Sequence, residues 1–199
     1  RTCHYPDQIP WYYMCDEAGI YVMAETNLES HGSWQKLGAI EPSWNIPGSL
    51  PQWREAVVDR ARSNYETFKN HTSIIFWSLG NESYGGDDIE AMNTYFKEKN
   101  DRRLVHYEGS YYTREYEDTI SDVESRMYAK PYEIEEYLSN NPKKPYILCE
   151  FMHDMGNSMG GLDTYMNFID KYEMYQGGYI LDFIDQALLV KDEVTGREV

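Results

Sequence analysis

The segment 73–83, with the sequence SIIFWSLGNES, constrains the fold more than any other stretch of the chain. It opens with an unbroken apolar run, rich in β-branched and aromatic residues and too short for a free-standing helix. Such a run is typical of a strand buried on both faces. Asn81 and Glu82 follow directly after the run stops at Gly80. Because α/β folds carry their chemistry at the C-terminal ends of strands, Glu82 is a candidate functional residue. The alternative is a carboxylate that caps the next helix or pairs with a surface base.

Strand and helix patterns alternate along the rest of the chain. Apolar runs predict strands over 20–25, 104–107, 146–149 and 178–184, a weaker strand over 125–128, and the end of another over 1–4. Helical patterns cover 9–18, 51–68, 88–99, 131–138 and 162–172, and Asp87 is the predicted N-cap of the third of these. The segment 111–125 is polar and irregular, and 191–197 has the composition of a hairpin turn.

This alternation indicates an α/β fold with parallel strands and right-handed crossovers. Polar residues follow nearly every predicted strand, which favours a (β/α)8 TIM barrel with its chemistry at that end. Such a barrel has eight strands, whereas the sequence offers about six. We therefore expect residues 1–199 to form one domain, the central part of a barrel that lacks its first and last strands.

Charge and cysteine content exclude several classes of function. A formal charge of -16 argues against nucleic acid or an anionic membrane as a partner. No apolar stretch approaches the roughly 18 residues that span a bilayer. Three cysteines without metal-type spacing predict reduced thiols and a cytoplasmic protein. The chain begins without methionine or a signal peptide, so we expect an excised fragment.

Glu150 ends the predicted strand 146–149, as Glu82 follows the predicted strand 73–79. Two carboxylates that converge on one face of a sheet can cleave a glycosidic bond. One must be protonated and the other ionised, and close approach of like charges raises one pKa. The alternative is two unrelated strand-end acids. The side chain of Cys149 is expected to point away from that of Glu150 and to pack against a helix.

Glu29 and His31 lie two residues apart after the predicted strand 20–25. Together with Glu82 they would form a mixed oxygen and nitrogen site for Mg²⁺, or for Mn²⁺. The alternative is that His31 is hydrogen-bonded within a structured loop. His153 opens a polar turn just after Glu150 and could donate to a sugar hydroxyl. We expect no organic cofactor.

Five segments in order, RTCHYP, NLESHG, IIFWSLGNES, ILCEFMHDMGNS and GGYILDFIDQAL, resemble the β-galactosidases of glycoside hydrolase family 2. The resemblance covers essentially the whole chain and is closest to the large-subunit type of the heterodimeric enzymes. It implies a retaining hydrolase of terminal β-D-galactosides that acts through a covalent glycosyl-enzyme. Glu82 would be the acid/base and Glu150 the nucleophile. Glu29, His31 and Glu82 would hold Mg²⁺.

The resemblance also implies which residues surround the sugar. Asn81 would hydrogen-bond the 2-hydroxyl, and His4 and His153 would contact galactose. Tyr128 would hydrogen-bond the nucleophile, and Arg1 would lie beside it. The full-length protein would be oligomeric or paired with a small subunit.

One position departs from the family pattern. Well-known members have a tryptophan at the floor of the galactose pocket, where this chain has Leu181. The departure removes an aromatic stacking face unless Phe183 or Trp77 compensates. It leaves the preferred sugar open.

Three other interpretations remain open at this point. The same fold and mechanism could act on another β-glycoside, such as a glucuronide or a mannoside. A metal-dependent barrel hydrolase could use Glu29 and His31 as ligands, with Glu82 activating a metal-bound water. The fragment by itself could be an inactive, truncated module.

Overall fold

The computed structural model describes residues 1–31, 45–155, 159–182 and 188–198. The strands in these ranges are β1 (Val22–Glu25), β2 (Ile74–Ser78), β3 (Leu104–His106), β4 (Glu124–Met127), β5 (Tyr146–Phe151) and β6 (Tyr175–Ile180). They form two three-stranded sheets, β1-β2-β3 and β4-β5-β6, in which every pairing is parallel. Strand order follows chain order, as the predicted α/β barrel requires. The described strands number six, fewer than the eight of a closed barrel.

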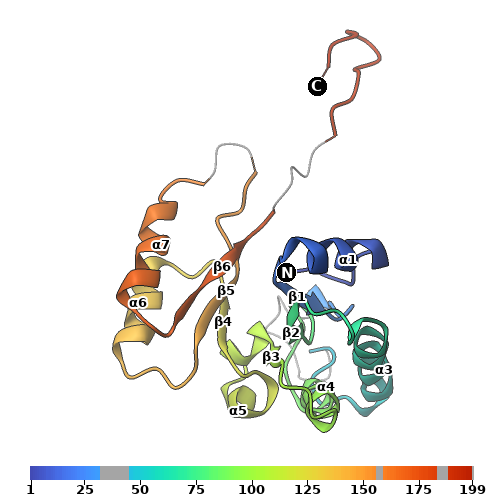
Figure 1. Cartoon of the computed structure of the whole chain (residues 1–199), viewed down its shortest axis with the longest axis vertical. Coiled ribbons are helices and arrows are strands. Elements are labelled where there is room, and N and C mark those ends of the chain that lie inside the picture. The colour runs from blue at the N-terminus through green and yellow to red at the C-terminus, as the bar shows by residue number, and fades with distance from the viewer. Residues whose placement is uncertain (32–44, 156–158, 183–187, 199) are drawn as a thin grey trace.

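The main helices are α1 (Ile9–Ala18), α3 (Pro51–Phe68), α4 (Asp87–Glu98), α6 (Pro131–Ser139) and α7 (Leu162–Lys171). All five were predicted within one residue at either end. Figure 1 shows α1, α3 and α4 around the first sheet and α6 and α7 beside the second. Shorter turns, η2 (Glu108–Tyr111), η3 (Arg114–Tyr116) and α5 (Glu117–Ile120), occupy the segment predicted to be irregular. The predicted hairpin turn near the C-terminus is confirmed by the antiparallel bridge between Lys191 and Glu198.

Two apolar cores hold the helices on the outer faces of the strands. Side chains from α1, α3 and α4 pack with Trp77 and Leu79 around the first sheet, and those of α6 and α7 pack with Leu148 around the second. Trp77 is fully buried and stacks on Phe96 of α4 at 5.5 Å between ring centroids. The helices therefore cover one face of each sheet, and a third, smaller apolar cluster of Met23, Val123 and Ile147 joins residues of both sheets.

Hydrogen bonds rather than a strand ladder connect the two sheets. The Asp122 N–H donates to the Val105 carbonyl at 2.8 Å, and the Val105 N–H donates to the Asp122 carboxylate at 2.7 Å. Next to this junction, His106 Nε2 and Ser125 Oγ are 2.8 Å apart. β3 and β4 therefore lie side by side, and the six strands follow one another without a reversal.

Several sequence predictions were wrong in detail. Residues 1–4 are not a strand, because their backbone makes only isolated bonds, such as that from the Thr2 N–H to the Met23 carbonyl at 3.1 Å. β6 begins at Tyr175, three residues before the predicted start, because the Tyr175 ring is buried and pairs with Tyr146. Asp87 is the first residue of α4 and not its N-cap, because Ser49 Oγ accepts the Asp87 N–H. The predicted strand residues 183–184 lie outside the described ranges.

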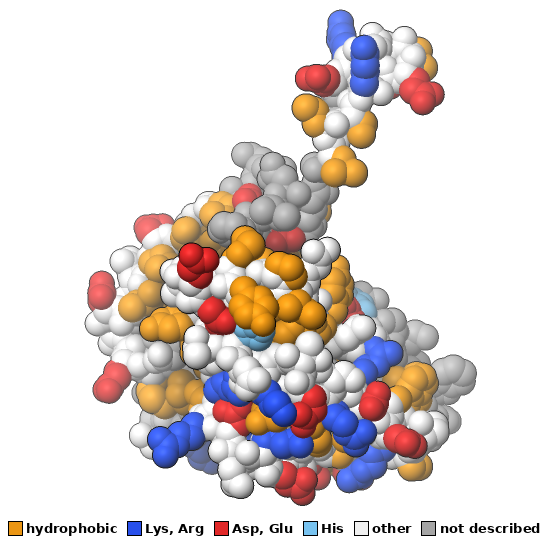
Figure 2. Space-filling model, turned by 45° about the vertical axis from the view of Figure 1, so that its right-hand side comes forward, with side chains coloured by type: hydrophobic (Ala, Val, Ile, Leu, Met, Phe, Trp, Pro, Cys, Tyr) orange, Lys and Arg blue, Asp and Glu red, His pale blue; other side chains and the backbone are white. Residues whose placement is uncertain are grey.

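The surface near α1 is partly apolar. Ile9, Tyr13 and Met14 of α1 are exposed, and Figure 2 shows hydrophobic side chains gathered on this side above a band of charged ones. An apolar patch with a charged rim is a typical contact surface for another element or protein. Among the described residues, no helix is both long enough and apolar enough to cross a bilayer.

Candidate active site

Carboxylates gather at the C-terminal ends of four of the six described strands. Glu25 is the last residue of β1, Glu82 follows β2, Glu108 follows β3, and Glu150 lies near the end of β5. The strands are parallel, so these ends meet on one edge of the fold. Glu25, Glu108 and Glu150 are each at least 96% buried, which requires compensating partners.

Arg1 supplies the central positive charge among these carboxylates. Its guanidinium donates to Glu25 Oε2 at 2.7 Å, to Glu150 Oε1 at 2.8 Å and to Asn81 Oδ1 at 2.8 Å. Burial would lower the pKa of Arg1, but the carboxylates of Glu25 and Glu150 help to hold it well above its ordinary value. The structure thus places Arg1 beside Glu150 and links the ends of β1, β2 and β5 through one side chain.

Glu150 is bound by donors on both carboxylate oxygens. The Tyr128 hydroxyl donates to Oε2 at 3.1 Å, while Arg1 donates to Oε1. His4 Nε2 lies 3.7 Å from Oε1, and the His153 ring stacks on that of Tyr128 with centroids 6.4 Å apart. Burial, followed by the charge of Glu150, raises the pKa of Tyr128, so the phenol keeps its proton.

A carboxylate that sequence reasoning did not select, Glu25, organises the opposite side of this cluster. Its Oε1 lies 3.1 Å from His4 Nδ1, and its Oε2 accepts from Ser78 Oγ at 2.8 Å. Burial would lower the pKa of His4, but the hydrogen bond with Glu25 raises it. The signal was present in the sequence, because Glu25 ends a buried strand just as Glu150 does.

The predicted cation ligands come together. One donor atom each from Glu29, His31 and Glu82 lies within 4.8 Å of the others, and His31 Nδ1 is paired with Glu82 Oε2. The backbone arranges this, because the Asn81 N–H donates to the Leu28 carbonyl at 2.9 Å. Two carboxylates and one imidazole form a donor set that suits Mg²⁺ or Mn²⁺. The residues present therefore fit such an ion.

Gly80 makes this approach of the two segments possible. A Cβ at residue 80 would lie 2.6 Å from the Leu28 carbonyl oxygen, and the Gly80 φ of 149° is one that side-chain-bearing residues rarely adopt. The glycine after the apolar run is therefore required by the packing of β2 against the segment that carries Glu29.

Below the carboxylates lies a layer of small polar side chains. His106 bridges two serines, with Nδ1 2.9 Å from Ser78 Oγ and Nε2 2.8 Å from Ser125 Oγ. Burial lowers the pKa of His106 well below its ordinary value, so the ring is neutral. A neutral ring between two hydroxyls joins β2, β3 and β4 without adding charge beneath Arg1.

The prediction for Cys149 was wrong. Its Sγ does not pack against a helix but shares the inner layer with donor atoms of His106 and Glu108, all within 4.8 Å. The cause is an irregularity in the pairing of β4 with β5, where Arg126 pairs with Leu148 and Met127 with Glu150. Cys149 is the extra residue, so the strict alternation of side chains fails at this point. Burial raises the pKa of the thiol, which therefore stays protonated.

Glu108 is the second site residue that sequence reasoning missed. Its Oε1 accepts the backbone N–H of Glu82 at 2.6 Å. Burial raises the pKa of Glu108 to about 8. Glu108 follows directly after the predicted strand 104–107, and Glu25 ends the predicted strand 20–25, so one strand-end pattern would have found both.

Comparison with known proteins agrees with this geometry. The model of the glycosyl hydrolases family 2 TIM barrel domain matches residues 1–199. The chain belongs to this family. It is 70% identical over its whole length to the β-galactosidase large subunit of Leuconostoc lactis, and 68% identical to that of Lactobacillus helveticus. The chain spans 32% of the length of each of these curated relatives.

Solved structures support the same fold. The β-glucuronidase of Lactobacillus rhamnosus superposes with a TM-score of 0.67 at 18% sequence identity, covering all of this chain and 39% of that one. At this identity the likeness shows the barrel fold alone. The predicted membership of family 2 is thus confirmed, and the described strands form part of its barrel.

Of the two aromatic residues considered as substitutes for the tryptophan that the resemblance implies, the structure describes only Trp77. Trp77 is buried against α4, and its indole N–H donates to Asp101 at 3.2 Å, so it does not line the site. Phe183 lies outside the described residues. Leu181 follows β6, where its N–H donates to the Phe151 carbonyl at 3.2 Å.

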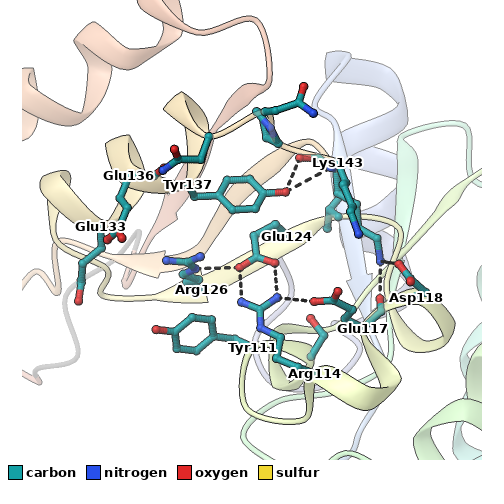
Figure 3. A pocket seen from close by; sticks show the side chains of 16 residues that line it. Tyr111, Arg114, Glu117, Asp118, Glu124, Arg126, Glu133, Glu136, Tyr137 and Lys143 are labelled. Atoms are coloured by element: carbon teal, nitrogen blue, oxygen red, sulfur yellow. Dashed lines mark hydrogen bonds and ion pairs between the residues drawn. The ribbon is translucent and has the colours of Figure 1, made fainter.

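A cavity of about 490 Å³ lies away from the carboxylate cluster of the family 2 domain, between α6 and the turns after β3. Figure 3 shows Arg114, Arg126, Glu117 and Glu124 directed at one another in its wall. Arg114 and Arg126 both bind Glu124, at 2.7 and 2.8 Å, and Arg114 also binds Glu117 at 2.9 Å. Because these charges neutralise one another, the network holds the outer surface together and presents no catalytic group.

Proposed function

We propose that the full-length protein is a retaining glycoside hydrolase that cleaves terminal β-D-galactosides. The observation that carries the proposal is the position of Glu150, which Arg1 and Tyr128 bind on opposite oxygens at the same barrel edge as Glu82. These two donors fix the orientation of the Glu150 carboxylate and aim it as a nucleophile. The names of the relatives from Leuconostoc lactis and Lactobacillus helveticus support a galactoside as substrate.

In the first step, Glu150 attacks the anomeric carbon, and the bond to the leaving oxygen breaks. Glu82 donates a proton to that oxygen, so the aglycone leaves as an alcohol. Asn81 is next to Glu82, and its amide oxygen is fixed by Arg1, which leaves the amide NH₂ to bind the sugar 2-hydroxyl. His4 lies beside Glu150 and His153 stacks on Tyr128, and we expect both to contact galactose.

In the second step, Glu82 accepts a proton from water, which attacks the anomeric carbon. The bond to Glu150 breaks, and galactose leaves with its original configuration. Retention predicts carboxyl groups of Glu82 and Glu150 roughly 5–5.5 Å apart, against roughly 6.5–9.5 Å for inversion. A substrate-bound structure of the full-length enzyme measures this separation.

Glu29, His31 and Glu82 are the proposed ligands of Mg²⁺, with Mn²⁺ as the alternative. When bound, the cation would supply positive charge next to the acid/base. Their side chains are 34%, 40% and 14% exposed, so the site is open to water and substrate.

A galactoside is favoured over a glucuronide by the bonding of Arg1. A glucuronide carboxylate needs a free cation, whereas each terminal nitrogen of Arg1 already donates to Glu150, Asn81 or the Cys149 carbonyl. The relatives named as large subunits support a small subunit as partner of the full-length protein. Hydrolysis of a panel of nitrophenyl β-glycosides tests the sugar, and purification with and without the small subunit tests the partner.

The decisive experiment traps the intermediate on the full-length protein with a 2-fluoro-galactoside and maps the labelled peptide. We expect one label per active site, on Glu150, and none in Glu150→Gln. A metal-dependent hydrolase, with Glu29 and His31 as ligands, would tolerate Glu150→Gln and accumulate no covalent sugar. A label on another residue would also overturn the proposal.

Residues 1–199 alone should have little or no activity. In the described structure β1 and β6 each have one partner strand, so each sheet keeps an open edge. Galactoside hydrolysis by this segment at a rate near that of the full-length enzyme would contradict the expectation.

A further inference from the structure

The backbone of Glu82 is held by a side chain from the next strand. The Glu82 N–H donates to Glu108 Oε1 at 2.6 Å, a short bond for this pair of atoms. Glu82 has a positive φ of 35°, which side-chain-bearing residues adopt only when their surroundings impose it. The bond therefore acts at a point where the chain would otherwise relax and turn the Glu82 carboxyl.

Glu108 is an unusual choice for a purely structural contact. It is 1% exposed, and among the described residues its Oε2 has no hydrogen-bond partner. A buried carboxyl with an unpaired oxygen destabilises the fold, and an apolar residue would fill the same space at lower cost. What distinguishes Glu108 from a buried carboxyl elsewhere in the fold is the bond from its other oxygen to the backbone of the proposed acid/base.

Another side chain at the end of β3, that of Tyr107, already fixes Ser83, the residue after Glu82. The Tyr107 hydroxyl donates to the Ser83 carbonyl and accepts the Ser83 N–H at 3.1 Å. Tyr107 thus anchors the turn after β2, and Glu108 adds a bond to Glu82 alone. The two contacts have separable effects, because one secures the turn and the other orients the residue that carries the carboxyl.

We propose that Glu108 is a positioning residue for Glu82. The inference rests on the proposed function, because it has Glu108 orient Glu82, the residue that exchanges protons with the leaving group and with water. Glu108 touches neither sugar nor nucleophile through the contacts described. It holds the Glu82 backbone so that the carboxyl faces the leaving oxygen.

This role predicts a dependence on the leaving group. Proton donation matters greatly when the aglycone is a poor leaving group, such as the glucose of lactose, and little when it is an acidic phenol. A misdirected Glu82 should therefore slow lactose far more than 2,4-dinitrophenyl galactoside. General loosening of the barrel would slow both substrates by the same factor.

The test uses the full-length enzyme with Glu108→Gln and Glu108→Leu. Glutamine keeps an acceptor for the Glu82 N–H, whereas leucine fills the space without one. We expect Glu108→Leu to lower kcat/KM on lactose at least tenfold more than on the dinitrophenyl substrate, because kcat/KM reports formation of the glycosyl-enzyme, and Glu108→Gln to restore most of the difference. Equal loss on both substrates, or a glutamine variant as impaired as the leucine variant, would overturn the inference.

The matched control is Asp88→Asn. Asp88 is also a carboxyl with 1% exposure and an oxygen without a hydrogen-bond partner among the described residues, but it lies on α4. Its substitution should leave the ratio of the two substrates unchanged. If Glu108→Leu does not fold, Glu108→Asp replaces it, because the shorter side chain withdraws the acceptor from the Glu82 N–H by one methylene. It should then change the ratio of the two substrates in the same direction.

A double substitution separates the two proposals. In a Glu82→Gln background, Glu108→Leu should no longer change the substrate ratio, because the carboxyl that it orients is absent. A persistent change would show that Glu108 acts on another group. If the wild-type enzyme labels on Glu150 but the ratio in Glu108→Leu is normal, only the inference fails. If wild type does not label, the proposed function fails.

Discussion

The Tyr128 hydroxyl donates to Glu150 Oε2 at 3.1 Å, joining the residue after β4 to a residue near the end of β5. The Tyr128 N–H also donates to the Glu150 carbonyl, at 2.8 Å, so side chain and backbone fix the same pair. Tyr128 holds a left-handed φ of 48° to make both contacts.

Replacing Tyr128 with phenylalanine should lower kcat about 10- to 100-fold, because a hydrogen bond to a charged group contributes about 1.5–3 kcal/mol. The ring and its stacking on His153 remain, so the melting temperature should change little. Tyr132→Phe, on the exposed face of α6, is the control and should keep full activity. Unchanged turnover in Tyr128→Phe would remove Tyr128 from the proposed mechanism.

Arg1→Lys in the full-length enzyme should abolish most of the activity despite the retained charge. Lysine cannot reproduce the fork that binds Glu25, Glu150 and Asn81 at once. A broken buried ion pair costs about 3–5 kcal/mol, so the thermal midpoint should fall as well. Arg62→Lys, exposed on α3, is the matched control. Near-normal hydrolysis by Arg1→Lys would mean that charge alone suffices.

Removal of divalent cations with a chelator should lower activity, and Mg²⁺ or Mn²⁺ should restore it. In Glu29→Gln the concentration of Mg²⁺ needed for half-restoration should rise about 10- to 100-fold, as expected for loss of one carboxylate ligand. Glu55→Gln, exposed on α3, should titrate like the wild type. Calorimetric titration with Mg²⁺ measures binding directly, and identical affinity in wild type and Glu29→Gln would disprove the site.

Ionisation of the buried Asp88 carboxyl should lower the free energy of unfolding as pH rises. Burial raises its pKa from 3.8 to about 6, so the folded state favours the protonated form. The resulting loss of stability develops as pH rises from about 4 to about 6 and is complete above that range. Asp88→Asn cannot ionise, so it should be more stable than wild type at pH 7 by about 1–3 kcal/mol, with a smaller gain at pH 4.5. Thermal unfolding at the two pH values measures the gain, and an equal shift at both would contradict the assignment.

Local sequence predicted the helices, the strands and the strand-end acids because apolar runs and prolines report burial and helix starts directly. The placement of Glu82 and of the bonded pair Arg1 and Glu150 at one edge of the fold follows from parallel strands that end there. Glu29 and His31 were predicted as metal ligands by spacing and by resemblance, and the structure brings their donor atoms together with that of Glu82. Their roles, like those of the sugar-binding residues, stay predictions.

What the sequence did not reveal depends on register and on partners distant along the chain. The pairing irregularity that turns Cys149 inward has no local signal, because it arises from how β4 meets β5. Glu108 was visible as a strand-end acid, but its contact with the Glu82 N–H requires the neighbouring strand to be placed. Asp87 failed as a cap because the acceptor for its N–H comes from Ser49, 38 positions earlier.

A substitution at Gly80 would disturb two parts of the candidate site at once, the residue Glu82 and the segment that carries Glu29. Any side chain at this position would push the end of β2 away from Leu28, and with it both Glu82 and the segment that bears Glu29 would shift. A single methyl group would therefore impair proton transfer and cation affinity together, although residue 80 itself takes part in neither.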